Sequence, residues 1–569
     1  MRTNNTYVAD FETTTEPFYN KYGYTRVWAC GVVNISDASV DYIGESIEDF
    51  VIWCESHNKS KVFFHNLKFD GEFILSYILK NNFKRDEDLT EANSFTTIID
   101  NFGAWYMLKV NFNGSIVTFY DSFKKLPFKV EELGKMLKLP EQKLTIDYDM
   151  ERPEGYHMTE EERTYLIHDC IIIAKALKSL FDKDMTCLTL SGDAQKFYKK
   201  LFPNPRQYEY MFPTISVEED AEIRLSYKGG FVYCNKDFAD QIVEGCSFDV
   251  NSLYPYVLHE CMLPMGTPIK YKGKYKKDKN FPLYIQHIMV DFELKEGYLP
   301  TIQIKHSRFN ESEYLERSDG VVSLYLCKPD LELFLEHYNI LFIKYLDGYK
   351  FNGSTKLFKT YVDYWYKEKA EAKASGEPTR LMIAKLMLNS LYGRYGMGTM
   401  RVNKLAYLED DITKYELDKP TYVSPQYTAL ASFVTAYARC ITIRASQLCY
   451  AKGIYLYSDT DSVHIKGYEA PEGMKVDDFE LGAWKNEGNF KGKFLRAKTY
   501  IKLKQDKEGK PYIDITCAGM PANIKNQIKE LPNPFETFKI GYCTIGKLVP
   551  KRVKGGVILI NMTYTLKAN

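Results

Sequence analysis

The chain has 569 residues, of which 45 % are apolar and 26 % charged, and 75 basic side chains balance 75 acidic ones. This composition excludes a collagen-like, low-complexity or wholly disordered chain, and the length predicts several domains with well-buried cores. No apolar run approaches the roughly 18 residues of a membrane span, and the polar start at residues 1–5 lacks the apolar region of a signal peptide, so we expect a cytoplasmic protein without a membrane partner.

The N-terminal third alternates predicted strands and helices. Thr159-x-x-Glu162 is a capping box, and the apolar spacing after it predicts a long helix that carries Tyr165 and Asp169. We place the main domain border at residues 185–230, where polar segments end in Tyr227-Lys228-Gly229-Gly230. The earlier elements are strands at 7–11, 27–33 and 61–65, helices at 46–55 and 70–81, and a hairpin that joins 105–111 to 115–120 around Asn113-Gly114.

The sequence from residue 260 onward predicts a less regular order of helices and strands. Residues 260–358 indicate mixed strands with many turns, and residues 359–393 indicate two helices interrupted at 375–378. Residues 394–424 favour a long hairpin or loop. Glu-rich helices and short strands are then expected to alternate to the end of the chain.

Two global features support more than one interpretation. Residues 490–569 carry 16 Lys and Arg against 5 Asp and Glu, so a basic end follows an acidic body; this suits a polyanion-binding protein, and a solvated basic surface is an equal alternative. The 84 aromatic residues favour core packing over stacking on unpaired bases.

The 12 cysteines lack a C-x-x-C pair, which predicts reduced thiols rather than a disulfide scaffold or a zinc ribbon.

Four carboxylates of the N-terminal third form a predicted metal site. Asp10 and Glu12 point to one side of a strand, and Asp169 shares a helix face with Tyr165. Asp70 lies at a strand-to-helix turn, where a helix cap is the ordinary interpretation. Together these acids can hold two Mg²⁺ ions about 3.5–4 Å apart for phosphodiester hydrolysis, with Tyr165 orienting the attacking water.

A second acidic centre is predicted downstream. Asp249 ends a strand, and Asp459 and Asp461 lie at the tip of a hairpin whose flanks are apolar, although Asp and Ser are also common in surface turns. Between these strands, one helix face carries Lys385, Asn389 and Tyr392, which could bind a triphosphate and a base or sugar.

The motifs in this order resemble those of family B DNA polymerases, and among them the protein-primed group of phages with protein-capped linear genomes. Residues 10–12, 66–70 and 165–169 resemble the three exonuclease motifs, and 249–255, 385–393 and 457–461 resemble polymerase motifs A, B and C. Residues 227–230 match the Y-x-G-G motif and residues 498–500 the K-x-Y motif.

The resemblance implies a multidomain fold, α/β and α+β, with an RNase H-like exonuclease followed by a right-hand polymerase. It also implies that two insertions interrupt the polymerase part. Insertion 1 would contact the terminal protein, and insertion 2 would close a tunnel around the template for processivity and strand displacement. The implied regions are the exonuclease domain at 1–188, the first palm segment at 189–260, insertion 1 at 261–358, the fingers at 359–395, insertion 2 at 396–424, the second palm segment at 425–530 and the thumb at 531–569.

The resemblance also implies residue roles. Two Mg²⁺ ions per centre, for which Mn²⁺ can substitute, would be held by Asp249, the Val250 carbonyl and Asp461 with help from Asp459, and by Asp10, Glu12, Asp70 and Asp169 in the exonuclease, where Tyr165 and Lys143 assist. The dNTP would contact Tyr254, Lys369, Arg380, Lys385, Asn389 and Tyr392. DNA would contact His65, Asn66, Phe69, Ser122, Phe123, Tyr148, Tyr227, Gly229, Gly230, Ser252, Arg439, Thr460, Lys498 and Tyr500.

Four positions depart from the family pattern. Arg380 lies one position away from an expected triphosphate-binding Lys, and the fingers carry extra residues at 372–378. Phe123 replaces an expected Leu, and Thr516 replaces an expected Lys near the primer end.

We therefore predict a phage replicative DNA polymerase, primed by a terminal-protein hydroxyl and acting in the cytoplasm of the infected bacterium. Its partners would be template and primer DNA, dNTPs, the terminal protein, and viral single-stranded and double-stranded DNA-binding proteins. The alternatives are a family B polymerase that uses DNA or RNA primers, a non-catalytic DNA-binding protein on a polymerase scaffold, and a nuclease without polymerase activity.

Overall fold

The structure is a computed structural model that describes residues 5–303 and 314–568. The first four residues of the polar start and the middle of the predicted insertion 1 lie outside the described residues. In the portion of the chain that the structure describes, no helix is long and apolar enough to cross a membrane. All 12 cysteines are free thiols.

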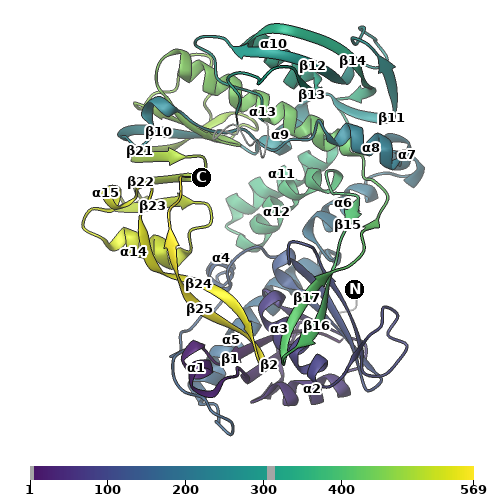
Figure 1. Cartoon of the computed structure of the whole chain (residues 1–569), viewed down its shortest axis with the longest axis vertical. Coiled ribbons are helices and arrows are strands. Elements are labelled where there is room, and N and C mark those ends of the chain that lie inside the picture. The colour runs from purple at the N-terminus through teal and green to yellow at the C-terminus, as the bar shows by residue number, and fades with distance from the viewer. Residues whose placement is uncertain (1–4, 304–313, 569) are drawn as a thin grey trace.

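An eight-stranded sheet organises the N-terminal region of the molecule (Figure 1), in the order β3-β2-β1-β4-β8-β7-β6-β5. The predicted strands and the hairpin around Asn113-Gly114 are confirmed. The strands are β1 (Thr6–Thr13), β2 (Val27–Asn34), β3 (Val40–Gly44), β4 (Ser60–Phe64), β5 (Lys84–Arg85), β6 (Ser94–Ile99), β7 (Trp105–Phe112) and β8 (Ser115–Asp121).

Helices cover both faces of this sheet. Because side chains alternate along β1, Phe11 packs with Phe50 of α2 in one core, while Val8 packs with Ile173 of α5 in another. Asp10 and Glu12 share the α5 face with Val8. The helices are α1 (Glu16–Tyr22), α2 (Ile47–Ser56), α3 (Leu67–Lys80), α4 (Val130–Met136) and α5 (Glu160–Phe181), and the capping box predicted for α5 is present.

Three helices connect this domain to the rest of the chain. They lie within residues 185–230, where the polar composition predicted a domain border. They are α6 (Leu190–Lys200), α7 (Pro205–Met211) and α8 (Val217–Arg224). Side-chain caps from Thr189, Asn204 and Ser216 begin them, which explains why this polar segment is helical.

A seven-stranded antiparallel sheet, ordered β23-β22-β21-β10-β20-β19-β9, forms the second large domain. The expectation of alternating Glu-rich helices and strands toward the end of the chain is wrong: α13 contains no acidic residue and buries its small and apolar side chains, and strands predominate over helices after it. The elements are β9 (Val232–Cys234), β10 (Ile242–Val250), α9 (Leu253–Glu260), α13 (Thr428–Ala451), β19 (Tyr455–Asp459), β20 (Ser462–Lys466), β21 (Trp484–Arg496), β22 (Thr499–Gln505) and β23 (Pro511–Cys517).

Two insertions separate the strands of this sheet. The first contains a four-stranded sheet, ordered β11-β14-β12-β13, and one helix. Two long helices come next, interrupted where predicted, and then one hairpin at residues 404–417, enclosed by the short pairing of residues 400–401 with 421–422. These elements are β11 (Leu263–Lys272), β12 (Leu283–Leu294), β13 (Val322–Cys327), α10 (Lys328–His337), β14 (Tyr338–Ser354), α11 (Lys359–Ser375), α12 (Pro378–Tyr395), β15 (Met400–Arg401), β16 (Lys404–Glu409), β17 (Ile412–Leu417) and β18 (Thr421–Tyr422).

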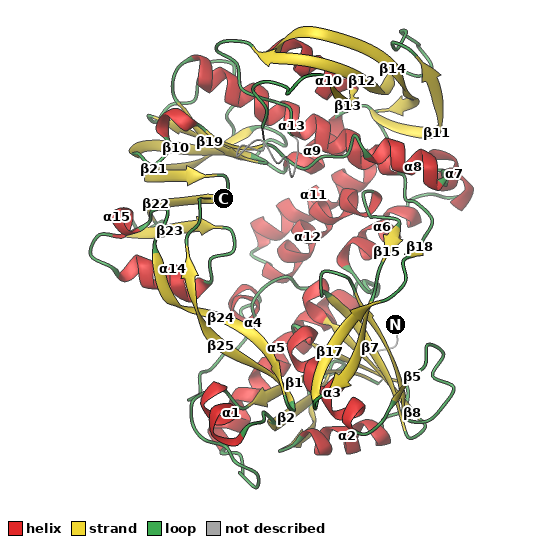
Figure 2. Cartoon of the chain, in the orientation of Figure 1, coloured by secondary structure: helices red, strands yellow, loops and turns green. Residues whose placement is uncertain are grey.

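The C-terminal elements return to the N-terminal domain. After α14 (Ala522–Glu530) and α15 (Pro534–Thr537), the hairpin of β24 (Cys543–Val553) and β25 (Gly556–Thr565) extends to the first sheet (Figure 2). Val557 enters the same core as Phe73 of α3, and the β16–β17 hairpin also contacts α3.

Candidate functional site

Four carboxylates line one cavity of about 330 Å³ between the first sheet and α5: Asp10, Glu12, Asp70 and Asp169. Asp10 and Glu12 lie on the α5 face of β1, and Asp169 comes from α5 itself. Asp70 lies in the first turn of α3. The predicted convergence of these acids is therefore confirmed.

The electrostatics of this cavity favour a cation. Burial raises the pKa of all four carboxyl groups, and the neighbouring Asp169 charge helps to raise the pKa of Asp10 to about 7. Among the described residues, the buried Oδ1 of Asp169 has no hydrogen-bond partner. Repelling carboxylates with an unsatisfied oxygen fit a hard divalent ion such as Mg²⁺. In the part of the chain that the structure describes, no three His, Cys, Asp or Glu side chains are already arranged to hold an ion.

Tyr165 and Lys143 complete the cavity. The Tyr165 hydroxyl lies 2.7 Å from the Tyr148 hydroxyl, and the Lys143 ammonium forms an ion pair with Asp169. Burial strongly raises the pKa of Tyr165, so its phenol stays neutral and can donate a hydrogen bond to water. Both residues lie in the cavity where they were expected, and their catalytic roles stay predictions.

The predicted contacts for a primer end divide into two groups. His65, Asn66 and Phe69 line the cavity, and Phe123 is 43 % exposed beside His65. Ser122 is fully buried: its hydroxyl donates to the Phe64 carbonyl at 3.0 Å and lies 2.9 Å from His65 Nδ1. Ser122 therefore orients the His65 ring, and its predicted direct contact with DNA is not available here.

The second acidic centre lies on the second sheet, in an open cavity of about 500 Å³ lined by Asp249, Asp459 and Asp461. β10 pairs with β20 so that Asp249 lies opposite Ser462, and the Val250 N–H donates to the Asp461 carbonyl at 2.8 Å. These pairings place the ends of two predicted strands side by side. The hairpin with acids at its tip is confirmed.

Residues that sequence reasoning missed also line this cavity. Glu487 comes from β21 and Lys502 from β22. Burial, together with the charges of Asp461 and Glu487, raises the pKa of Asp249 to about 6. No local pattern marks Glu487 or Lys502, because β21 pairs with β10 across more than 200 intervening residues.

Lys502 is 5 % exposed and lines the same cavity as Asp249. Its ammonium donates to His464 Nε2 at 3.1 Å, and burial lowers its pKa to about 8. A buried cation at this position offsets some of the repulsion among the carboxylates.

The predicted nucleotide-binding face is present on α12. Lys385 and Asn389 are exposed and Tyr392 is half-buried, and the Tyr392 ring stacks on Tyr254 with ring centroids 4.2 Å apart. Lys369 donates to the Ser252 hydroxyl at 3.0 Å. Burial, followed by the charges of Lys385 and Lys373, lowers the pKa of Lys369, so this cluster of cations favours an anion.

Arg380 does not extend freely from the same helix. Its guanidinium forms ion pairs with Glu368 and Glu371 of α11. These pairs join the two helices, and a contact with a triphosphate would compete with them.

The Y-x-G-G segment contacts the hairpin that carries Asp459 and Asp461. Thr460 N–H donates to the Phe231 carbonyl at 2.7 Å, and a Cβ at Gly230 would lie 2.7 Å from the Thr460 hydroxyl, so a larger residue would collide there. The Tyr227 ring packs against Gly396, and Gly229 is exposed. At the far side of the hairpin, Lys498 Nζ lies 3.2 Å from Asp459, and Tyr500 lines the cavity.

The predicted contact of Arg439 with DNA needs correction. Arg439 is only 4 % exposed, forms an ion pair of 2.6 Å with Asp330, and donates to the carbonyls of Lys228 and Gly229 at 2.8 Å. A long charged residue on a mostly apolar helix is buried here because these partners satisfy its donors. Arg439 therefore positions the Y-x-G-G segment.

The chain is similar in sequence and in structure to known DNA polymerases. A family model described as DNA polymerase type B, organellar and viral, matches residues 54–478. The chain is 42 % identical to the DNA polymerase of Bacillus phage phi29 over 99 % of both chains, and 33 % identical to that of Streptococcus phage Cp-1 over 99 % of this chain and 98 % of the relative. It superposes on phi29 DNA polymerase complexed with primer-template DNA and incoming nucleotide substrates with a TM-score of 0.91 and 40 % identity, covering 99 % of this chain and 100 % of the other.

Proposed function

The chain belongs to the organellar and viral type B DNA polymerases, and from that premise we propose that it replicates the genome of a phage and proofreads its own product. The matches confirm the predicted multidomain α/β fold class. The observation that carries the proposal is the pair of separate carboxylate cavities, one on each large sheet, together with the α12 face that exposes Lys385 and Asn389. One cavity suits phosphodiester hydrolysis and the other nucleotidyl transfer.

The predicted domain boundaries belong to this proposal, and several coincide with ends of elements. α9 ends at Glu260, α11 begins at Lys359 and α14 ends at Glu530. These positions support palm, fingers and thumb borders at residues 260, 359 and 530. The two insertions then occupy 261–358 and 396–424.

In the polymerase centre, Asp249, Asp461 and the Val250 carbonyl would hold two Mg²⁺ ions, for which Mn²⁺ can substitute. When bound, such ions supply Lewis-acid stabilisation of the attacking and leaving oxygens. Lys385 and Lys369 neutralise the triphosphate, and the stacked rings of Tyr254 and Tyr392 form the flat surface beneath the sugar and the new base pair.

In the exonuclease centre, Asp10, Glu12, Asp70 and Asp169 would hold the corresponding ions. The neutral Tyr165 phenol orients the attacking water, and Lys143 holds Asp169 in place. The exposed rings of Phe123 and Tyr148 would stack on the frayed primer end, because unpaired bases stack on aromatic side chains.

The ring-like chain of contacts around the centre of the molecule supports processive synthesis with strand displacement. The β16–β17 hairpin of insertion 2 contacts α3 of the exonuclease domain, and the C-terminal hairpin contacts both. Lys554 of the β24–β25 turn forms an ion pair of 2.6 Å with Asp411 of the β16–β17 turn. These contacts join fingers, insertion 2, exonuclease domain, thumb and palm in a closed circuit, which would hold DNA without a separate clamp.

We also propose that a terminal-protein hydroxyl primes synthesis and that insertion 1 contacts this protein. Viral single-stranded and double-stranded DNA-binding proteins would act with the enzyme in the cytoplasm of the infected host cell. The whole-length similarity to phage polymerases, including both insertions, supports this over a polymerase that uses only DNA or RNA primers.

Paired substitutions test the two-centre assignment. Asp461→Ala should abolish primer extension and retain 3′–5′ degradation of single-stranded DNA, and Asp10→Ala should do the reverse. If either change abolishes both activities in a folded protein, the assignment is wrong. Transfer of a labelled nucleotide to a cognate terminal protein tests priming; extension of DNA primers without any such transfer would favour the DNA- or RNA-primed alternative.

A further inference from the structure

A lysine-rich loop, residues 272–279, joins β11 to β12 at the edge of the insertion 1 sheet. It carries five lysines and one acid in eight residues. All five lysines are exposed, and the acid, Asp278, is already paired with Lys350 at 2.7 Å. Within residues 5–303 and 314–568, none of the five ammonium groups forms an ion pair.

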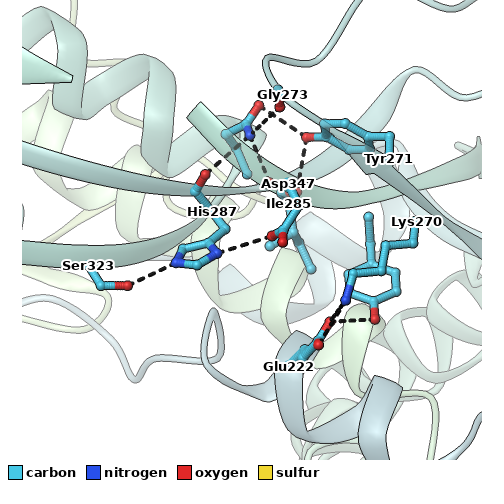
Figure 3. A network of polar contacts seen from close by, with 10 residues as sticks. Glu222, Lys270, Tyr271, Gly273, Ile285, His287, Ser323 and Asp347 are labelled. Atoms are coloured by element: carbon cyan, nitrogen blue, oxygen red, sulfur yellow. Dashed lines mark hydrogen bonds and ion pairs between the residues drawn. The ribbon is translucent and has the colours of Figure 1, made fainter. Parts of the chain in front are cut away.

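The loop is held in one conformation by a buried polar network. The fully buried Gln286 accepts the Tyr275 N–H at 2.9 Å and donates to the Gly273 carbonyl at 3.0 Å and the Asp347 carbonyl at 2.8 Å. Figure 3 shows Gly273, Tyr271 and Asp347 gathered at this point of the sheet. The Tyr275 ring stacks on Tyr284 with centroids 4.0 Å apart.

The base of the loop is anchored to the neighbouring domain and strands. Lys270 pairs with Glu222 of α8 at 2.7 Å, and His287 bridges Asp347 and Ser323 (Figure 3). Blocks of like charge are usually disordered because the charges repel one another. Here the network holds them together, and a bound polyanion would relieve the repulsion.

The side chains of the loop favour binding to a phosphate backbone over binding to a protein surface. All its cations are lysines, which bind phosphate as point charges, whereas Arg is the residue that pairs with carboxylates in protein interfaces. Lys is depleted in protein interfaces, which depend on exposed aromatic anchors. The only aromatic ring of the loop, Tyr275, is half-buried and stacked inward.

We propose that the lysine-rich loop is a DNA-backbone contact outside the two catalytic centres. The loop contributes no residue to either catalytic cavity. It would therefore hold DNA that extends beyond the primer terminus. This inference rests on the polymerase assignment and is independent of protein priming.

The experiment compares a loop variant with a charge-matched control. The loop variant is Lys276→Gln, Lys277→Gln and Lys279→Gln. The control, Lys59→Gln, Lys84→Gln and Lys452→Gln, removes three exposed lysines that are scattered over the surface. Binding is measured by fluorescence anisotropy between about 50 and 200 mM salt, the range over which phosphate contacts weaken, on a short primer–template and on the same DNA extended by single strand or by duplex.

On extended DNA, the loop variant should lose salt dependence that the control retains. Each lost duplex-phosphate contact lowers the slope of log Kd against log salt by about 0.9, and each single-strand contact by about 0.7. For three duplex contacts, the fourfold rise in salt should weaken binding about 40-fold less than in the control. The extension that shows the loss identifies single-stranded or duplex DNA as the occupant.

Two results would overturn the proposal. In one, the loop variant matches the control on every extended DNA. In the other, it binds DNA normally and loses affinity only for a cognate terminal protein. Binding of the short primer–template by the unmodified chain is measured in the same series; its absence would instead contradict the polymerase assignment.

Discussion

Arg552 near the tip of the C-terminal hairpin forms an ion pair of 2.8 Å with Glu72 of α3, 480 residues earlier in the chain. Glu72 is 3 % exposed and also accepts the Tyr415 hydroxyl of β17 at 3.0 Å, while the Arg552 guanidinium lies 4.4 Å from the Tyr415 ring centroid. One buried carboxylate thus joins the C-terminal hairpin, the β16–β17 hairpin and α3 of the N-terminal domain. Burial raises the pKa of Glu72, and Arg552 partly offsets this, so the carboxylate depends on its partners.

Glu72→Gln should open this junction more often. The amide keeps an acceptor for Tyr415 and loses the charge that holds Arg552. We expect dissociation from long DNA to be about tenfold faster, the effect of about 1.4 kcal/mol, with single-nucleotide insertion on short primer–template unchanged. Product lengths under conditions that allow a single binding event measure this. Glu316→Gln, which removes an exposed ion pair with Lys236, is the control; equal product lengths for both variants would contradict the role of the junction.

The pH dependence of the two activities should differ. A carboxyl group with a raised pKa is protonated, and a poor metal ligand, below that value. Asp10 has a pKa of about 7 and Asp249 of about 6, so on lowering the pH at limiting Mg²⁺, exonuclease activity should fall before polymerase activity. Saturating Mg²⁺ should move both midpoints to lower pH, because the ion competes with the proton. Rate profiles across the neutral and mildly acidic range measure both effects, and an exonuclease midpoint below that of the polymerase would contradict the assignment.

Tyr254 should discriminate against ribonucleotides. Its ring stacks on Tyr392 and cannot move away from an added 2′-hydroxyl without losing that contact. Tyr254→Val should raise the ratio of ribonucleotide to deoxyribonucleotide incorporation by about 10- to 100-fold, the range that one steric contact supplies. Tyr254→Phe keeps the ring and should keep the discrimination. Competition between rNTP and dNTP gives the ratio, and equal ratios for both variants would exclude Tyr254 as the steric element.

Arg439→Lys should destabilise the protein without a direct effect on DNA. A lysine cannot bind Asp330 and reach both the Lys228 and Gly229 carbonyls, which costs about 1–3 kcal/mol. Arg444 lies on the same helix as Arg439 and forms an exposed ion pair with Glu336 of α10. Arg444→Lys should therefore change the free energy of unfolding very little. Denaturant unfolding and DNA affinity are measured together. Normal stability with weakened DNA binding would restore the direct DNA contact for Arg439.

The local patterns of the sequence were sufficient for most elements and for both acidic centres. Asp10 and Glu12 share a face because strands have a period of two, and Tyr165 and Asp169 share one because a spacing of four is close to the helical period of about 3.6 residues. The capping box at Thr159 and the break at residues 375–378 are likewise properties of short segments. The three helices between 190 and 224 were missed because their polar composition conceals side-chain caps.

Which distant residues meet these local groups became visible only in the folded chain. Glu487 and Lys502 enter the second acidic cavity through strand register, and Arg439 and Ser122 are buried by partners that lie elsewhere in the chain. Glu72 appears in the sequence as an ordinary helix residue, yet it joins α3 to two hairpins from distant parts of the chain. Each motif could thus be predicted from the chain itself, because its geometry depends on near neighbours. Burial and long-range pairing could not, because they depend on how sheets and domains pack and are not encoded in any short segment.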